Sequence, residues 1–114
     1  MFVLDDSGEF DWPVDVKKPV DGGKFQLQRF TARFRPVGEE EQATIFKLPI
    51  TEQNVAQARA CWIGWGDDVC DADKQPLPYD EETRDRLLGR SYISNAVTRA
   101  YWDAMTGKKA ERKN

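Results

Sequence analysis

The stretch between Trp62 and Glu82 separates two parts of the chain with different hydrophobic patterns. It reads Trp-Ile-Gly-Trp-Gly-Asp-Asp-Val-Cys-Asp-Ala-Asp-Lys-Gln-Pro-Leu-Pro-Tyr-Asp-Glu-Glu. Its two tryptophans are expected to close a helix, and its Pro-Leu-Pro-Tyr-Asp sequence to open the next one. Strand patterns precede this joint and helical patterns follow it. The sequence therefore predicts an α+β fold, with an N-terminal β-hairpin or small antiparallel sheet packed against three to four C-terminal helices.

Two strands are predicted before the joint. Between Phe10 and Lys17 apolar and polar residues alternate, which is the period of a strand with one buried face. Pro13 has no N–H to donate, so this strand is expected at the edge of the sheet. Residues 18–23, rich in Gly and Pro, predict a turn that leads into a second strand over residues 24–35.

The second strand changes its apolar parity along its length. Phe25 and Leu27 are apolar at odd positions, whereas Phe30 and the apolar residues after it are at even ones. A β-bulge between Gln28 and Phe30 would return all of them to one face, and we predict one there. Residues 2–4 are predicted as a third short strand.

Two helices are predicted between the strands and the acidic loop. The first spans residues 39–47 and is expected to turn Ala43 and Phe46 inward. The second is expected to start with Thr51 as its N-cap and to end at Gly64 or Gly66.

Two further helices are predicted after the acidic loop. Asp80 is the expected N-cap of the first, which ends at Gly89. Ser91 is the expected N-cap of the last helix, whose apolar residues form one stripe and whose end is marked by Gly107.

The length and composition indicate one globular domain. The chain has 114 residues, of which 39% are hydrophobic and 32% charged, and its net charge is -3. We expect a single α+β domain over residues 1–107 and a basic, disordered tail over residues 108–114. With no apolar run near the 20 residues needed for a membrane span and no secretory signal, we expect a soluble protein of the cytoplasm.

No cofactor or metal site is expected from the residues. Histidine is absent, and Cys61 and Cys70 have neither metal-ligand spacing nor an oxidising context, so we expect two reduced thiols. The acids after Trp65 match several positions of a calcium loop, but Pro76 occupies the position that requires Gly. We therefore interpret this loop as a turn held by Asp side chains, and we expect no enzymatic activity.

Basic and aromatic residues alternate in the second strand. Arg29, Arg33 and Arg35 are interleaved with Phe30 and Phe34, a pattern compatible with stacking of bases and contact with phosphates. An amphipathic strand with inward phenylalanines produces the same pattern. Because the chain is acidic overall, we expect no nucleic-acid partner, and a single-stranded nucleic-acid-binding module remains an alternative.

Several motifs occur in a characteristic order. The first half carries Phe10-Asp-Trp-Pro-Val14, Pro19-Val-Asp-Gly-Gly23 and Phe30-Thr-Ala-Arg-Phe-Arg35. The second carries Trp62-Ile-Gly-Trp65, Val69-Cys-Asp-Ala-Asp73, Pro76-Leu-Pro-Tyr79, the helix from Ser91 to Tyr101, and Gly107-Lys-Lys. Over residues 9–107 this order resembles that of phage tail assembly chaperones, small proteins of phage and prophage tail modules. The chain departs from their commoner Asp-x-Asp-Gly turn by having Lys74 after Asp73.

The resemblance implies a non-enzymatic assembly factor of the bacterial host cytoplasm. Its partners would be the tape measure protein and the major tail tube protein, with self-association possible and no nucleic acid or membrane. The alternative is a minor tail or connector component that stays in the virion. We expect contacts along the exposed part of the last helix and in the opening stretch, and the candidate protein-binding residues are Trp62, Trp65, Tyr79, Tyr92 and Trp102.

Overall fold

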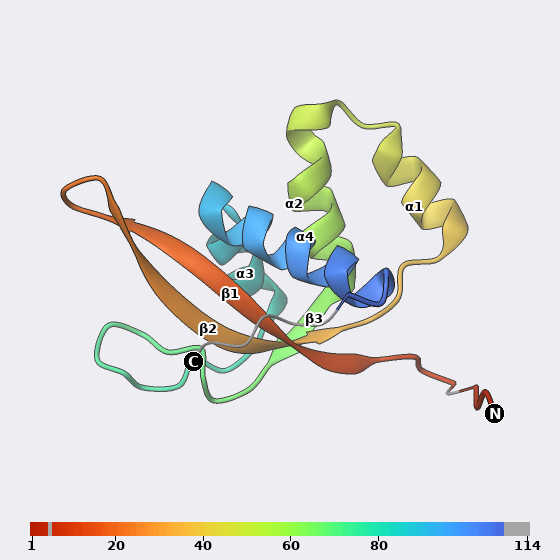
Figure 1. Cartoon of the computed structure of the whole chain (residues 1–114), viewed down its shortest axis with the longest axis horizontal. Coiled ribbons are helices and arrows are strands. Elements are labelled where there is room, and N and C mark those ends of the chain that lie inside the picture. The colour runs from red at the N-terminus through yellow and green to blue at the C-terminus, as the bar shows by residue number, and fades with distance from the viewer. Residues whose placement is uncertain (5, 109–114) are drawn as a thin grey trace.

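The computed structural model describes residues 1–4 and 6–108 and confirms the α+β architecture. A three-stranded antiparallel sheet has the order β1-β2-β3. In Figure 1, α4 lies beside the long β1–β2 hairpin, and α2 and then α1 lie beyond it. The elements are β1 (Phe10–Val20), β2 (Lys24–Phe34), α1 (Glu39–Phe46), α2 (Ile50–Cys61), β3 (Trp62–Trp65), α3 (Glu81–Leu88) and α4 (Ser91–Met105).

The hairpin is regular along its whole length. Its register runs without interruption from Phe10 opposite Phe34 to Val20 opposite Lys24. The bulge predicted between Gln28 and Phe30 is therefore wrong. Its premise fails because Phe25 is 66% exposed near the hairpin tip and does not need to share the buried face.

The ends and edges of the hairpin follow its proline and glycine content. β1 is an edge strand, as Pro13 predicted. The turn is confirmed but is shorter than expected, because both strands continue to Val20 and Lys24. Gly22 and Gly23 adopt φ values of 83° and 71°, a conformation that is unfavourable for residues with a Cβ atom. The third strand predicted at residues 2–4 is absent from the described structure.

The largest correction concerns the two tryptophans that were expected to close a helix. α2 ends at Cys61, and Trp62–Trp65 form β3, which pairs with β2. The N–H of Arg35 donates to the carbonyl oxygen of Cys61 at 2.9 Å, so the chain leaves the helix directly into the sheet. The register of this pair shifts between Arg33 and Phe34, which places the irregularity of β2 further along than predicted.

Helix boundaries agree with the predicted signals at some termini and not at others. Asp80 caps α3, since its Oδ1 accepts the Thr83 N–H at 2.7 Å. Gly107 follows α4 with φ 77°, as expected for a C-terminal glycine. The caps predicted at Thr51 and Ser91 are wrong. α2 already begins at Ile50, and α4 begins at Ser91 itself, and neither helix has a side-chain hydrogen bond at its N-cap.

The orientation of α1 also differs from the prediction. Ile45 is its buried residue, whereas Ala43 is exposed and Phe46 is 57% exposed. α1 packs against α2 and turns Ile45 inward, so Phe46 reaches the surface beside α4. This rotation creates the groove described below.

One hydrophobic core joins the sheet to α2, α3 and α4. Its buried members include Val14, Val16, Ala32, Phe34, Ala58, Cys61, Trp62, Leu88, Val97, Ala100 and Tyr101.

The predicted tail over residues 108–114 lies, apart from Lys108, outside the described residues. Across residues 1–4 and 6–108, none of the helices has the length and apolar character required to cross a membrane.

Candidate functional site

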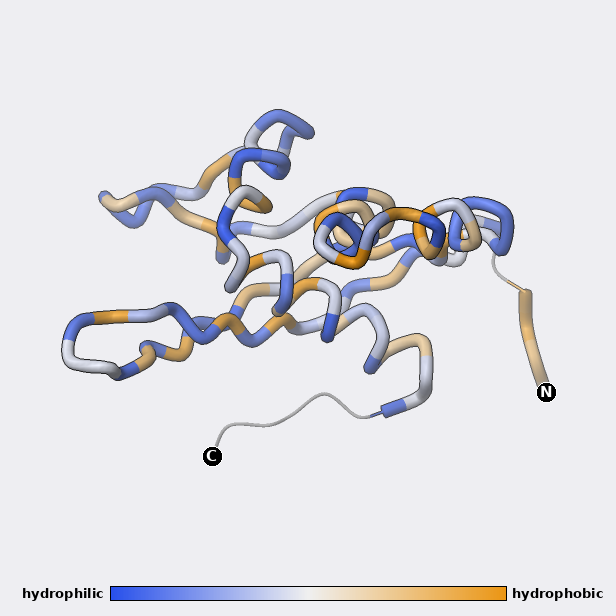
Figure 2. Tube along the Cα trace, turned by 90° about the horizontal axis from the view of Figure 1, so that it is seen from above, coloured by the Kyte–Doolittle hydropathy of each residue, from blue (hydrophilic) through white to orange (hydrophobic). Residues whose placement is uncertain are grey.

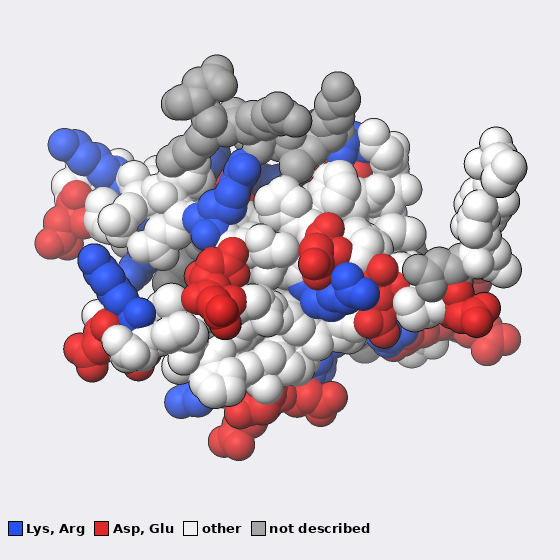
Figure 3. Space-filling model, turned by 90° about the horizontal axis from the view of Figure 1, so that it is seen from below, with Lys and Arg blue, Asp and Glu red and all other residues white. Residues whose placement is uncertain are grey.

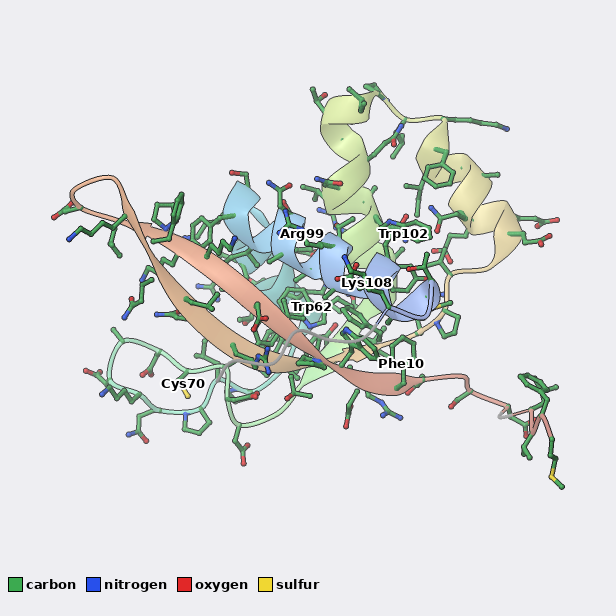
Figure 4. The ribbon with its side chains drawn as sticks, in the orientation of Figure 1. Phe10, Trp62, Cys70, Arg99, Trp102 and Lys108 are labelled. Carbon is green, nitrogen blue, oxygen red and sulfur yellow. The ribbon has the colours of Figure 1, made fainter. Side chains whose placement is uncertain are left out.

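Trp62 is the centre of the joint between sheet and helices. Its side chain is 1% exposed and its ring centroid lies 5.5 Å from that of Phe30 and 5.3 Å from that of Trp65. Trp65 in turn contacts Tyr79 edge to face at 4.8 Å. Figure 4 shows Trp62 in the middle of the molecule, between the hairpin and the helices. Trp62 therefore belongs to the core and presents almost none of its surface to a partner.

Arg84 links α3 to the end of β3 from inside the protein. Its side chain is 8% exposed, and its Nη1 donates to the Trp62 carbonyl oxygen at 3.1 Å and to the Tyr79 hydroxyl at 3.2 Å. Asp85 pairs with the guanidinium through Oδ1 at 3.0 Å. Burial raises the pKa of Tyr79 above its usual value, so the phenol stays neutral at physiological pH. This network connects α3 to the end of β3 through a buried guanidinium.

The acidic loop is a turn held by its own side chains, as predicted. Asp71 Oδ1 accepts the N–H groups of Asp73 at 2.9 Å and Gln75 at 3.0 Å. Lys74 adopts φ 62°, the conformation that Gly provides in the commoner turn. Within the described ranges, no three His, Cys, Asp or Glu side chains are grouped so as to hold a metal ion.

An apolar depression on the surface lies between α1 and the C-terminal end of α4. It encloses about 330 Å³. Phe46 and Trp102 stack across it with ring centroids 6.2 Å apart and planes 14° apart, and Met105 is 43% exposed beside them. Glu39 and Gln42 supply its polar side. The apolar lining, which we call the α1–α4 groove, comprises Val37, Ala43, Phe46, Tyr101, Trp102 and Met105.

Tyr101 sets the position of the segment that leads into α1. The residue is 2% exposed, and its hydroxyl accepts the Val37 N–H at 2.9 Å. Burial is the main reason that its pKa is raised. The phenol is therefore neutral at neutral pH and fixes one wall of the groove through this hydrogen bond.

The five predicted binding residues fall into two regions. Trp62, Trp65 and Tyr79 form the joint, and Tyr92 lines a cleft beside Trp62. Trp102 lies apart, on α4 beside α1, where its ring stacks on that of Phe46 (Figure 4).

Sequence reasoning missed Phe46 and Met105 as groove residues. The sequence predicts an inward Phe46 and a single apolar stripe on the last helix that includes Met105. α1 has apolar residues at helical spacing, as the sequence indicates. Its packing against α2 decides that Ile45, and not the adjacent Phe46, turns inward. The contact between Phe46 and Trp102 joins residues 56 positions apart, so no local sequence pattern indicates it.

Arg29 and Arg33 in β2, and Arg35 directly after it, each form an ion pair with a carboxylate. Arg29 pairs with Asp15 at 2.6 Å, directly across the hairpin. Arg33 contacts Asp11 at 3.2 Å, and Arg35 contacts Glu41 at 2.9 Å. These pairs offset the positive charge that phosphate binding would require.

The two cysteines are free and lie in different environments. Cys61 is fully buried, and burial raises the pKa of its thiol to about 12. Cys70 is exposed in the acidic loop, at the periphery of the molecule in Figure 4.

Comparison of the chain with protein-family models, curated proteins and solved structures gave no match.

Proposed function

We propose that the protein is a phage tail assembly chaperone that binds a helix of the tape measure protein in the α1–α4 groove and acts together with tail tube subunits. The resemblance of residues 9–107 to this family supports the class of function. The observation that carries the mode of binding is an open apolar groove between two helices, with Phe46 57% exposed in its lining.

The chemistry of the groove specifies the kind of segment it would accept. An apolar stripe on an amphipathic helix fits a trough lined by aromatic and aliphatic side chains. Glu39 at the polar side would favour a Lys or Arg of the partner next to that stripe. Covering such stripes on an unassembled, helix-rich protein is the task of a chaperone, because exposed apolar surface promotes aggregation.

Co-expression with a tape measure protein from the same tail module tests this proposal. The wild-type chain is expected to keep that protein soluble and to co-purify with it, and the complex is expected to retain added tail tube protein. Phe46→Glu combined with Met105→Glu should abolish both effects, because it places two charges in the groove. Ile50→Glu is the matched control, since Ile50 is 84% exposed outside the groove.

Two results would overturn the proposal. One is a tape measure protein that stays insoluble with the wild-type chain, or that binds the groove variant equally well. The other is stoichiometric recovery of this chain from purified virions, which would identify a structural tail or connector component instead.

A further inference from the structure

Residues 1–4, Met-Phe-Val-Leu, form an apolar segment that stands away from the rest of the protein. Phe2 is 87% exposed, Val3 77% and Leu4 78%. Figure 2 shows this hydrophobic segment beside the chain end, set apart from the body, and Figure 3 shows it as a projecting white column with acidic side chains near its base. A contiguous exposed apolar stretch of this kind marks an interaction site.

A second unfilled surface is a cleft between the outer part of the hairpin, the loop after β3 and the start of α4. It encloses about 310 Å³, at the lower end of the range for binding pockets. We call it the hairpin cleft. Its floor is apolar and consists of Val16, Phe30, Trp62, Leu87 and Ile93. The space is sufficient for a short run of apolar side chains.

The rim of the hairpin cleft is basic. Lys18 and Arg90 are exposed at its edge, and neither forms an ion pair with a described residue. Asp68 also lines the cleft, where its Oδ2 accepts the Thr31 N–H at 2.9 Å, so one carboxylate stands against the two cations Lys18 and Arg90. The cleft therefore favours an apolar segment accompanied by acidic residues.

The segment at residues 1–4 has this chemistry, since the exposed Asp6 follows it closely. The α1–α4 groove is less suitable for it, because Glu39 lies at the groove's polar side and the exposed Glu40 follows it in the first turn of α1. Like charges across an interface oppose association. Charge complementarity thus selects the hairpin cleft.

Residues 1–4 lie at one end of the long axis of the molecule, which measures 45 Å, and the tip of the hairpin lies at the other (Figure 1). Residues 1–9 lead into the start of β1, whereas the cleft lies near its other end, at Val16 and Lys18. We propose that residues 1–4 of one copy dock in the hairpin cleft of a second copy. This inference does not depend on the proposed chaperone function.

Such a contact joins two different surfaces and is therefore head to tail. An open chain of copies always keeps one free segment at one end and one free cleft at the other, so association continues until a ring closes or a filament forms. Two variants that each lose one of these surfaces would behave differently alone and together, and this provides a sharp test.

The test measures the mass of the full-length protein by sedimentation velocity up to about 1 mM, a range that includes weak association. Wild type is expected to form oligomers larger than a dimer as its concentration rises. The segment variant, Phe2→Asp with Leu4→Asp, and the cleft variant, Lys18→Glu with Arg90→Glu, should each associate at least about tenfold more weakly. All four positions are exposed, and unchanged circular dichroism and thermal melting would verify that the variants fold.

Mixing the two variants is expected to give a heterodimer and nothing larger, because one intact cleft meets one intact segment. The matched controls are Ile50→Asp for the segment variant and Lys47→Glu with Lys108→Glu for the cleft variant. They change exposed residues outside both surfaces and should associate like wild type.

Three outcomes would overturn the proposal. A wild-type protein that stays monomeric over the whole range would do so, and so would a mixture of the two variants that forms no heterodimer. Loss of association in Phe46→Glu with an unaffected cleft variant would show that the α1–α4 groove forms the contact instead.

Discussion

Arg84 Nη1 donates a hydrogen bond to the carbonyl oxygen of Trp62 at 3.1 Å. The bond joins the first turn of α3 to the first residue of β3, 22 positions earlier in the chain. Both residues are buried, so the bond is shielded from competing water. The angle at which the helical part leaves the sheet therefore depends on a charged side chain inside the joint.

Replacement of Arg84 by Met should lower the free energy of unfolding by about 2–4 kcal/mol. The change leaves the Trp62 carbonyl without this donor and Asp85 without its buried partner. Urea denaturation followed by tryptophan fluorescence measures the loss. Arg86→Met, on the exposed side of the same helix, should stay within about 0.5 kcal/mol of wild type. Equal effects of the two substitutions would contradict the role assigned to Arg84.

Trp62→Ala should destabilise the protein by about 3–5 kcal/mol, because it leaves a large cavity among packed aromatic rings. Ile50→Ala removes an apolar side chain that is exposed, so it should change the free energy of unfolding little. The same urea titrations compare the two variants. A cost for Trp62→Ala below about 1 kcal/mol would mean that this residue does not anchor the core.

Lys74→Gly should stabilise the protein by about 0.5–1 kcal/mol. Lys74 has φ 62°, a left-handed conformation that is unfavourable for residues with a Cβ atom. Lys74→Ala keeps the Cβ atom and should have a free energy of unfolding near that of wild type. Thermal or urea unfolding of the three proteins tests this, and an equal gain from Ala and Gly would exclude backbone strain as the cause.

The two thiols should differ in their reaction with an aromatic disulfide reagent. Cys70 is exposed and should react rapidly in the folded protein. Cys61 is buried with its pKa raised to about 12, so its thiolate is scarce and inaccessible until the protein unfolds. Release of one equivalent of chromophore before denaturant is added and a second afterwards is the expected result. In Cys70→Ser the rapid phase should disappear.

Asp80 should make stability depend on pH in the acid range. The Thr83 N–H that it accepts holds the pKa of its carboxyl below the usual 3.8. The folded state thus binds the proton less readily than the unfolded state, so the contribution is present above pH 3.8 and is lost as the pH falls through the folded-state value. Asp80→Asn keeps a capping side chain but removes the titration.

The difference in unfolding free energy between wild type and Asp80→Asn should therefore be constant near neutral pH and shrink below about pH 4. Urea titrations across this range provide the measurement. A difference that is the same at every pH would show that the cap does not act through its charge.

The parts of the fold that were predicted correctly depend on interactions between near neighbours in the chain. Gly22 and Gly23 determine the hairpin turn because few other residues adopt their backbone angles. Asp80 caps a helix three residues away, and the Asp71 side chain binds N–H groups two and four residues away. Such contacts have the same geometry in almost any protein, so the sequence was sufficient to predict them.

Only the tertiary structure decided the features that join distant residues. Trp62–Trp65 became a strand because β2 offered an unpaired edge, and the long-range pairing outweighed the helical pattern of the segment. Phe46 was turned toward Trp102 because α1 buries Ile45 against the rest of the fold. The arginines of β2 were paired because the hairpin register places Asp15 opposite Arg29. The sequence by itself thus determined the hairpin, the four helices and some of their ends. Packing free energy, which depends on every element at once, determined β3, the joint and the groove.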